Sequence, residues 1–150
     1  MREPSRPRRS PLLPLSLLIA ACGAARVTTT PVISPGDVEE PVSAVLTAAL
    51  AADARAERAD SLWDRDATVV ANGTLRSEPP RFAGIGAGGE VGITSSRLEA
   101  RQSLIWVYLE YRWLSLKDGT ARDGKATVLL VPKEGGLGWK IVHAHSSAGE

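Results

Sequence analysis

The chain has 150 residues, of which 43% are hydrophobic and 23% are charged, proportions typical of one globular domain. Of its 18 basic and 17 acidic residues, four basic ones and one acidic one lie within residues 1–21, which leaves 14 basic against 16 acidic residues in the remainder. This mild acidity excludes a protein built to attract phosphate backbones, and we expect no nucleic-acid partner.

Residues 1–21 have the pattern of a secretory signal peptide. Four arginines precede the apolar run PLLPLSLLIAA (residues 11–21), which is shorter than the roughly 20 apolar residues of a spanning helix. The tetrapeptide IAAC that ends the run resembles the bacterial lipobox. That resemblance implies cleavage after Ala21, acylation of Cys22, and a lipid-anchored protein of the bacterial cell envelope facing the periplasm or the cell exterior. The alternative is an ordinary secretory peptide followed by a chance cysteine.

Cys22 is the only cysteine, so no disulfide competes for its thiol. Residues 22–36 mix small residues, threonines and prolines without helical or strand periodicity, which predicts a flexible linker after the acylated cysteine. In an extended polyproline-like state this linker reaches on the order of 40 Å.

A helix is predicted from a cap at Asp37 to about Asp53, because apolar residues recur at three- and four-residue spacings. This stripe contains Val38, Val42, Val45, Leu46, Ala49 and Leu50. A second, shorter helix is expected at about 55–65, with Ala59, Leu62 and Trp63 facing inward.

Residues 67–73, ATVVANG, predict a short strand that ends in an Asn-Gly turn. Residues 77–92 contain two consecutive prolines and five glycines, which predicts a loop with at most a brief strand. The loop sequence GIGAGG only superficially resembles a dinucleotide fingerprint, because no buried parallel strand precedes it and no helix follows. We therefore expect no cofactor.

The remaining sequence predicts an antiparallel meander of four strands, at 95–103, 104–116, 121–132 and 139–147, with glycine-containing turns after the second and the third. Together with the helices, this pattern predicts an α+β fold: two N-terminal helices packed on one face of a strongly curved antiparallel sheet, with a cone-like shape.

The segments GWKIVHAHSS (138–147) and IWVYLEYRW (105–113), together with the helical opening, resemble the nuclear transport factor 2-like superfamily. Within it the likeness is to SnoaL-like domains and to the association domain of calcium/calmodulin-dependent kinase II. The resemblance spans residues 37–148 and implies a cystatin-like cone with a central pocket, often dimeric through the outer sheet face. It does not imply one chemistry, because this fold carries isomerases, cyclases, dehydratases and non-catalytic scaffolds.

Candidate site residues follow from strand alternation and from this resemblance. By likeness to the association domain, one face of the long strand points into the pocket, and alternation along the last strand adds two histidines beside Trp139 and Ile141. The expected ligand-binding residues are Trp63, Tyr108, Glu110, Arg112, His143 and His145. Trp63 is also expected to be a core residue between helix and sheet.

Several roles are open for these side chains. They could orient a small apolar ligand, Glu110 and His143 could form an acid–base pair, or the histidines could be structural. His143 and His145 lack a visible third ligand, so no metal site is expected. The sequence thus predicts an envelope lipoprotein whose domain binds a small ligand or a protein partner without catalysis; the alternative is a small isomerase or lyase using Glu110 and His143.

Overall fold

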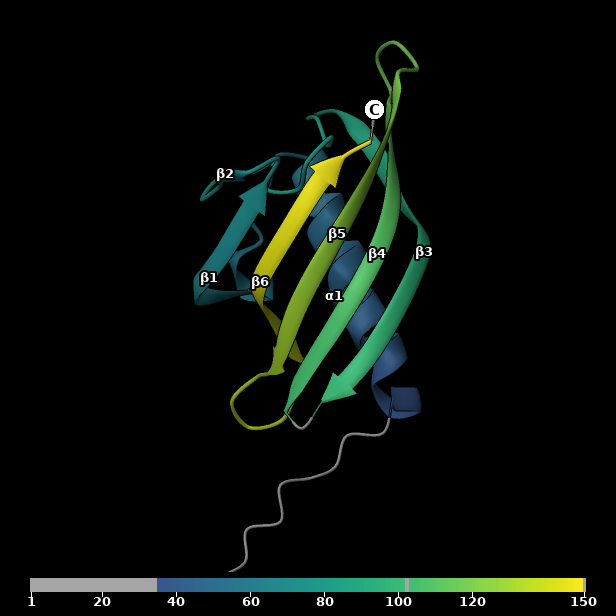
Figure 1. Cartoon of the computed structure of the whole chain (residues 1–150). Coiled ribbons are helices and arrows are strands. Elements are labelled where there is room, and N and C mark those ends of the chain that lie inside the picture. The colour runs from purple at the N-terminus through teal and green to yellow at the C-terminus, as the bar shows by residue number, and fades with distance from the viewer. Residues whose placement is uncertain (1–34, 102, 150) are drawn as a thin grey trace, which may run out of the picture.

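The computed structural model describes residues 35–101 and 103–149 (Figure 1). The signal peptide, Cys22 and the linker up to residue 34 lie outside this range. Its elements, in chain order, are helix α1 (Pro35–Ala54), the 3-10 turn η1 (Asp60–Leu62) and six strands. The strands are β1 (Trp63–Ala71), β2 (Thr74–Leu75), β3 (Gly89–Arg101), β4 (Leu104–Ser115), β5 (Ala121–Pro132) and β6 (Trp139–Ala148).

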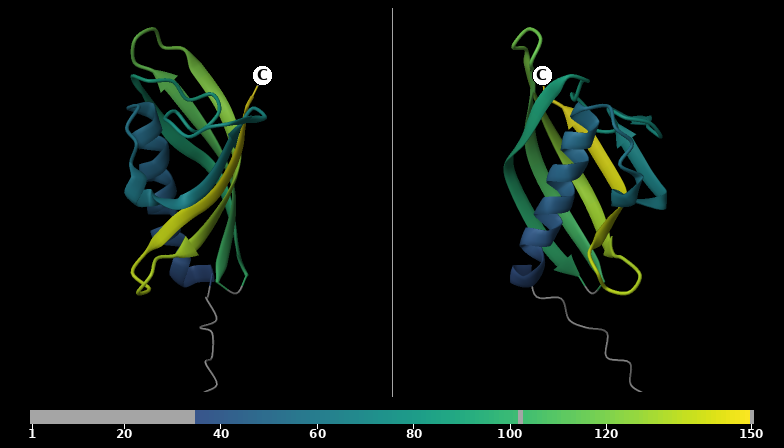
Figure 2. Two further views of the ribbon diagram at one scale, coloured as in Figure 1. Left: turned by 90° about the vertical axis from the view of Figure 1, so that its left-hand side faces the viewer. Right: turned by 180° about the vertical axis from the view of Figure 1, so that it is seen from behind.

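The six strands form one sheet in the order β2-β1-β6-β5-β4-β3, and α1 crosses one face of it (Figures 1 and 2). Strands β3 to β6 make the predicted antiparallel meander. The prediction of a wholly antiparallel sheet is wrong, however, because β1 runs parallel to β6. The sequence pattern identifies strands but does not specify a pairing between segments that are so distant along the chain. We call the face that α1 covers the inner face and the opposite one the outer face.

The predicted apolar stripe of α1 forms one wall of the core. Its residues Val38, Val42, Leu46, Ala49 and Leu50 are buried, and they join a cluster with inward side chains of β4 and β5. The strand contributions are Ile105, Val107, Leu109, Tyr111 and Trp113 from β4, and Ala126, Val128 and Leu130 from β5. The hydrophobic effect therefore fixes α1 across the inner face. No helix in the described part of the chain has the length and apolarity needed to span a bilayer.

The predicted second helix at 55–65 is wrong. The chain leaves α1 through Ala56 and Ala59, whose φ angles of 55° and 46° lie in the left-handed region, and only the three residues of η1 are helical before β1 begins at Trp63. Residues 55–62 offer few apolar side chains, so a helix there would gain little from packing. Instead, Arg55 pairs with Glu57 at 2.9 Å on the surface.

A β-bulge in β6 changes the direction of the two histidines. Leu130 pairs with Ile141 but Leu129 pairs with His143, which leaves Val142 as the extra residue. Before the bulge Ile141 is buried; after it Ala144 is buried, whereas His143 is half-buried and His145 exposed. One inserted residue moves all following side chains to the opposite face. The prediction that the histidines point inward with Trp139 and Ile141 is therefore wrong.

Gly124 of β5 provides a test of core packing. A Cβ atom there would lie 2.6 Å from the Tyr111 hydroxyl oxygen and closer still to its ring. Gly124→Ala should therefore destabilise the protein by about 1–3 kcal/mol through overpacking, measured by denaturant unfolding.

Gly92→Ala in β3 is the matched control, because nothing lies within 4 Å of the position that its added Cβ atom would take. It should leave stability unchanged or raise it by about 0.5–1 kcal/mol. Equal effects of both substitutions would contradict this account of the core.

Candidate functional site

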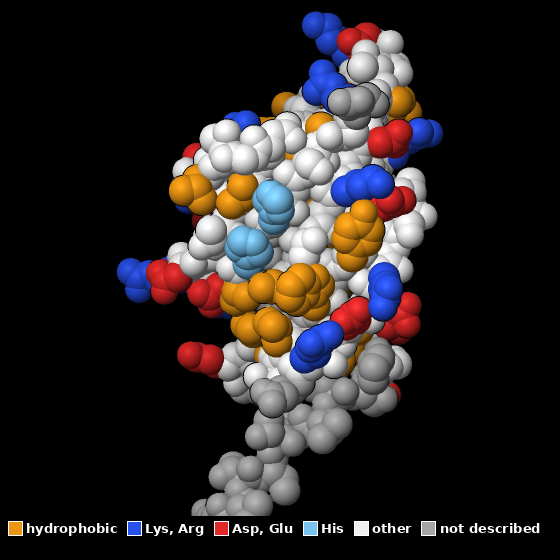
Figure 3. Space-filling view, in the orientation of Figure 1, with side chains coloured by type: hydrophobic (Ala, Val, Ile, Leu, Met, Phe, Trp, Pro, Cys, Tyr) orange, Lys and Arg blue, Asp and Glu red, His pale blue; other side chains and the backbone are white. Residues whose placement is uncertain are grey.

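The candidate side chains of β4 lie on the outer face of the sheet. Odd-numbered residues from Ile105 to Trp113 are buried, so Tyr108, Glu110 and Arg112 face away from α1. The prediction that these three point inward is wrong, because both faces of β4 carry bulky residues and alternation alone does not say which face is covered. His143 and His145 lie on this same outer face, beside an exposed apolar area (Figure 3).

The charged members of this set form cross-strand ion pairs. Arg112 donates to both carboxylate oxygens of Asp123 at 2.7 and 2.9 Å, and Glu110 lies 3.1 Å from Lys125. The Arg112 guanidinium lowers the pKa of Asp123 through its hydrogen bonds. Because these ion pairs are exposed to solvent, they add little to the stability of the fold. They do, however, engage Glu110 and Arg112 with partners within the sheet.

The sheet register separates Glu110 from His143. Glu110 is opposite Lys125, whereas His143 is opposite Leu129, two strands away and four residues along. With strands about 4.8 Å apart and a rise of about 3.3 Å per residue, the two backbone positions are about 16 Å apart. The alternative in which Glu110 and His143 form an acid–base pair is therefore wrong. Among the described residues, no group of three or more His, Cys, Asp or Glu side chains is placed to hold a metal ion.

Between the end of α1 and the sheet, the inner face is closed by residues 81–83. The Asp53 carboxylate accepts hydrogen bonds from the backbone N–H groups of Arg81 at 2.5 Å and Phe82 at 2.6 Å. Ser146 Oγ accepts from the Ala83 N–H at 2.9 Å, and the Tyr111 hydroxyl donates to the Ala83 carbonyl at 2.6 Å. The buried side chains of Asp53, Tyr111 and Ser146 are thus all hydrogen-bonded to the backbone of this segment.

Burial changes the proton affinity of two of these groups. It raises the pKa of Asp53 to about 6, against the opposing effect of the two backbone N–H donors and of Arg81. It also raises the pKa of Tyr111 well above its usual range, which keeps the hydroxyl a hydrogen-bond donor. Sequence reasoning missed Asp53. The sequence does hint that Asp53 is special, because it is an acidic residue in the otherwise apolar last turn of a helix, where the helix dipole disfavours negative charge.

Of the predicted ligand-binding residues, Trp63 is the one that lines a pocket on the inner side. This pocket, about 510 Å³ in volume, lies beside β1 between η1 and the segment that follows β2. We call it the Trp63 pocket. A smaller pocket of about 350 Å³ lies between the first half of α1 and β3.

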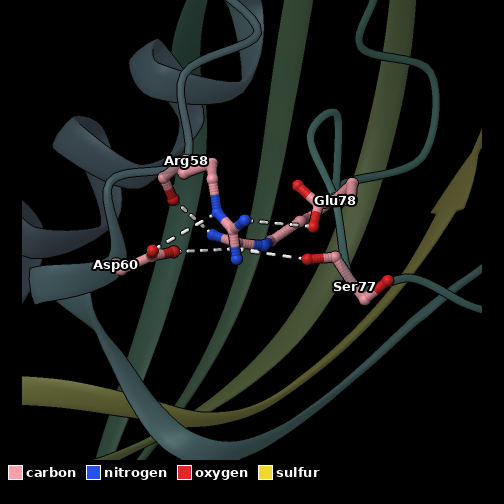
Figure 4. Close-up of polar contacts among 5 residues, drawn as sticks. Arg58, Asp60, Ser77 and Glu78 are labelled. Carbon is pink, nitrogen blue, oxygen red and sulfur yellow. Dashed lines mark hydrogen bonds and ion pairs between the residues drawn. The ribbon is translucent and has the colours of Figure 1, made fainter.

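Arg81, which sequence reasoning also missed, forms part of the wall of the Trp63 pocket. Its buried guanidinium lies 4.9 Å from the centre of the Trp63 ring and donates to the Arg58 carbonyl at 2.5 Å. It also contacts Asp60 at 3.2 Å and the Ser77 carbonyl at 3.4 Å. Figure 4 shows how the Arg58 and Asp60 side chains approach the segment that carries Ser77 and Glu78. This network holds the wall in place.

One helix across the inner face of a bent, six-stranded mixed sheet defines an α+β protein of cystatin-like architecture. The sequence matches no protein-family model and no curated protein. Solved structures, by contrast, do match. A nuclear transport factor 2-like superfamily protein from Salmonella enterica serovar Typhimurium has a TM-score of 0.61 at 11% identity, covering 78% of this chain and 94% of that one.

Two further solved structures also match the fold of this chain. A protein with a cystatin-like fold from Nostoc punctiforme has a TM-score of 0.63 at 6% identity, covering 78% of this chain and 94% of its own. The association domain of CaMKII from C. elegans has a TM-score of 0.59 at 16% identity, covering 75% and 96% respectively. These similarities confirm that the chain has the nuclear transport factor 2-like fold.

The buried carboxyl of Asp53 predicts a specific pH dependence. Because its folded-state pKa is raised from 3.8 to about 6, its protonation stabilises the fold below about pH 4, and this contribution is lost as the pH rises through about 6. The contribution amounts to about 3 kcal/mol. Asp53→Asn keeps an acceptor oxygen but does not titrate, so denaturant unfolding between pH 4 and 7 should show a flatter stability curve.

Asp53→Ala is the paired variant. It removes the acceptor as well, and it should lower stability across this whole pH range by about 1–3 kcal/mol, because the N–H groups of Arg81 and Phe82 lose their partner. A pH profile of Asp53→Asn that parallels the wild type would contradict the assignment.

Proposed function

We propose that this chain is a bacterial envelope lipoprotein, anchored through Cys22, whose nuclear transport factor 2-like domain is a non-catalytic binding module that pairs with a second copy of itself. The observation that carries the pairing is an exposed apolar area on the outer face of the sheet. The lipobox-like IAAC sequence supports the anchor. The matching CaMKII structure, which is an association domain, supports assembly as a use of this fold.

The apolar area, which we call the outer patch, consists of Trp106, Tyr108, Leu129 and Val131. Trp106 is 47% exposed and Tyr108 42% exposed, unusually high values for large aromatic residues in the middle of a sheet. Register places Trp106 beside Leu129, and Leu129 beside His143. Exposed contiguous apolar surface marks interaction sites, and Trp and Tyr are the residues most often found to dominate binding energy.

The rim of the outer patch carries both signs of charge. On the β3 side, Glu99 lies 3.0 Å from Arg97 and 3.1 Å from Arg101; on the other side, Glu110 is paired with Lys125. A two-fold interface brings a surface against itself, so a rim of one sign would repel its copy. The mixed rim avoids this repulsion and favours a second copy over a strongly charged partner.

A membrane anchor would favour this pairing, because tethered copies share a thin layer and meet at high effective concentration. The non-catalytic part of the proposal is supported by the separation of Glu110 from His143 and by the engagement of Glu110 and Arg112 in cross-strand ion pairs.

Trp106→Lys should weaken self-association, because it places a charge in the centre of the outer patch. Native mass spectrometry and sedimentation of the mature lipoprotein in mild detergent should show a dimer whose dissociation constant rises at least about ten-fold in this variant, the loss typical of a central aromatic contact.

Leu75→Lys is the control, since Leu75 is 73% exposed on the edge strand β2, which β1 and β6 separate from β5. It should dimerise like the wild type. A wild-type protein that is monomeric at all concentrations, or a dimer that Trp106→Lys leaves intact, would contradict the proposed pairing.

The anchor is tested separately. In a bacterial host, mass spectrometry of the mature amino terminus should show an acylated Cys22, and Cys22→Ser should release the protein from the membrane fraction because two or three acyl chains are lost. Gly23→Ala, which keeps the IAAC sequence, should remain in the membrane. An unmodified Cys22 would refute the anchor but not the pairing, which depends on the outer patch.

A further inference from the structure

The lining of the Trp63 pocket has a strong excess of positive charge. Five cationic side chains line it, against the two carboxylates of Asp60 and Asp64. The cations are Arg58, Arg65, Arg76, Arg81 and Lys140. The chain after residue 21 is mildly acidic as a whole, so this excess is a local feature of the pocket and not a consequence of net charge.

In the described part of the chain, carboxylates pair with only two of these five cations, Arg58 and Arg81, and Arg58 also lies 3.3 Å from Glu78. Asp60 is shared between Arg58, at 3.3 Å, and Arg81, at 3.2 Å. Asp64 accepts a hydrogen bond from the Asp66 N–H at 3.1 Å and forms no ion pair among the residues that the structure places. Within the described ranges, Arg65, Arg76 and Lys140 have no carboxylate within 4.0 Å.

These three unpaired cations come from three separate segments. Arg65 is on β1, Arg76 directly follows β2, and Lys140 is on β6. The order β2-β1-β6 makes the three segments neighbours in the sheet. Clustered like charges repel one another, and a bound anion reduces that repulsion. A partly enclosed cleft lined by one sign of charge also concentrates ligands of the opposite sign.

The rest of the pocket wall is suited to a small organic anion. Arg81 is held by the network of Arg58, Asp60 and Ser77, so one cationic wall is already ordered before any ligand arrives. Trp63, Ala67 and Val69 provide apolar surface beside the charges. A volume of about 510 Å³ lies within the range of small-molecule sites.

We propose that the Trp63 pocket is a binding site for a phosphate monoester with a small apolar body, held by Arg65, Arg76 and Lys140. A phosphate monoester carries close to two negative charges at neutral pH and offers three acceptor oxygens, which matches three unpaired cations better than a single carboxylate does. The same headgroup chemistry occurs in soluble metabolites and in phosphatidic acid. Arg65 and Arg76 belong to the β1–β2 side of the sheet, whereas Lys140 lies opposite Val131 at the edge of the outer patch. The site therefore depends on residues other than Trp106, on which the dimer experiment rests.

Calorimetric titration of the mature lipoprotein in detergent at low salt tests this site, with phenyl phosphate and short-chain dihexanoyl phosphatidic acid as probes. Saturable binding of at least one probe is expected, weakened at least ten-fold by the double substitution Arg76→Gln with Lys140→Gln. Lys117→Gln with Arg122→Gln, after β4 and on β5, is the matched control, since it removes the same charge from residues that do not line the pocket. It should bind as the wild type does.

The two probes distinguish the source of the ligand. Binding of phenyl phosphate supports a soluble ligand, and binding of dihexanoyl phosphatidic acid alone supports a lipid headgroup. Absence of saturable binding to both probes, or an equal loss in both double variants, would overturn the proposal. Circular dichroism confirms that each variant is folded. Trp106→Lys should retain phosphate binding, so failure of the dimer and failure of this site remain distinguishable.

Discussion

The arrangement of side chains in this domain depends on one extra residue in β6. The bulge at Val142 lets Trp139 and Ile141 enter the core while Ala144 and Ser146 take the same direction further along. Without it, His143 and His145 would be forced against the apolar core, where imidazoles without partners are costly to bury. The bulge therefore moves two polar rings to the outer face and brings Ser146 inward, where it binds the Ala83 N–H.

That inward serine belongs to a second constraint, the attachment of residues 81–83 to the interior. Asp53 at the end of α1, Tyr111 on β4 and Ser146 on β6 all bind this short segment. The same segment carries the Arg81 guanidinium that forms a wall of the Trp63 pocket. This segment thus connects the core to the pocket. It is held in place by hydrogen bonds to three buried side chains, whereas the sequence pattern predicts a second helix covering the sheet.

The sequence pattern was sufficient for features decided by local chemistry. The stripe from Val38 to Leu50 specified α1, and the boundaries of β4 and β5 followed from apolar runs and Asp-Gly or Gly-Gly turns. The sequence pattern was insufficient where a tertiary contact determines which side chain is buried. Tyr108 and Tyr111 are chemically alike, yet only the position of α1 determines which is buried. Likewise, alternation along β6 assumes an unbroken ladder, and a bulge leaves no compositional trace at Val142.

The two surfaces for which we propose roles are centred on different strands of the sheet, the pocket on β1 and the outer patch on β4 and β5. Trp63, Ala67 and Val69 line the pocket on the inner side, and Trp106 belongs to the outer patch. A pair of domains joined through the outer patch would leave Arg65 and Arg76 of both pockets open to solvent, whereas Lys140, opposite Val131, would lie at the edge of the interface. Since each domain would hang on a linker that reaches on the order of 40 Å, both pockets would remain within reach of the membrane surface. Two sites on one assembly bind a surface far more tightly than one, so a lipid-headgroup ligand would be held more tightly by the pair, whereas a soluble ligand would bind each pocket separately.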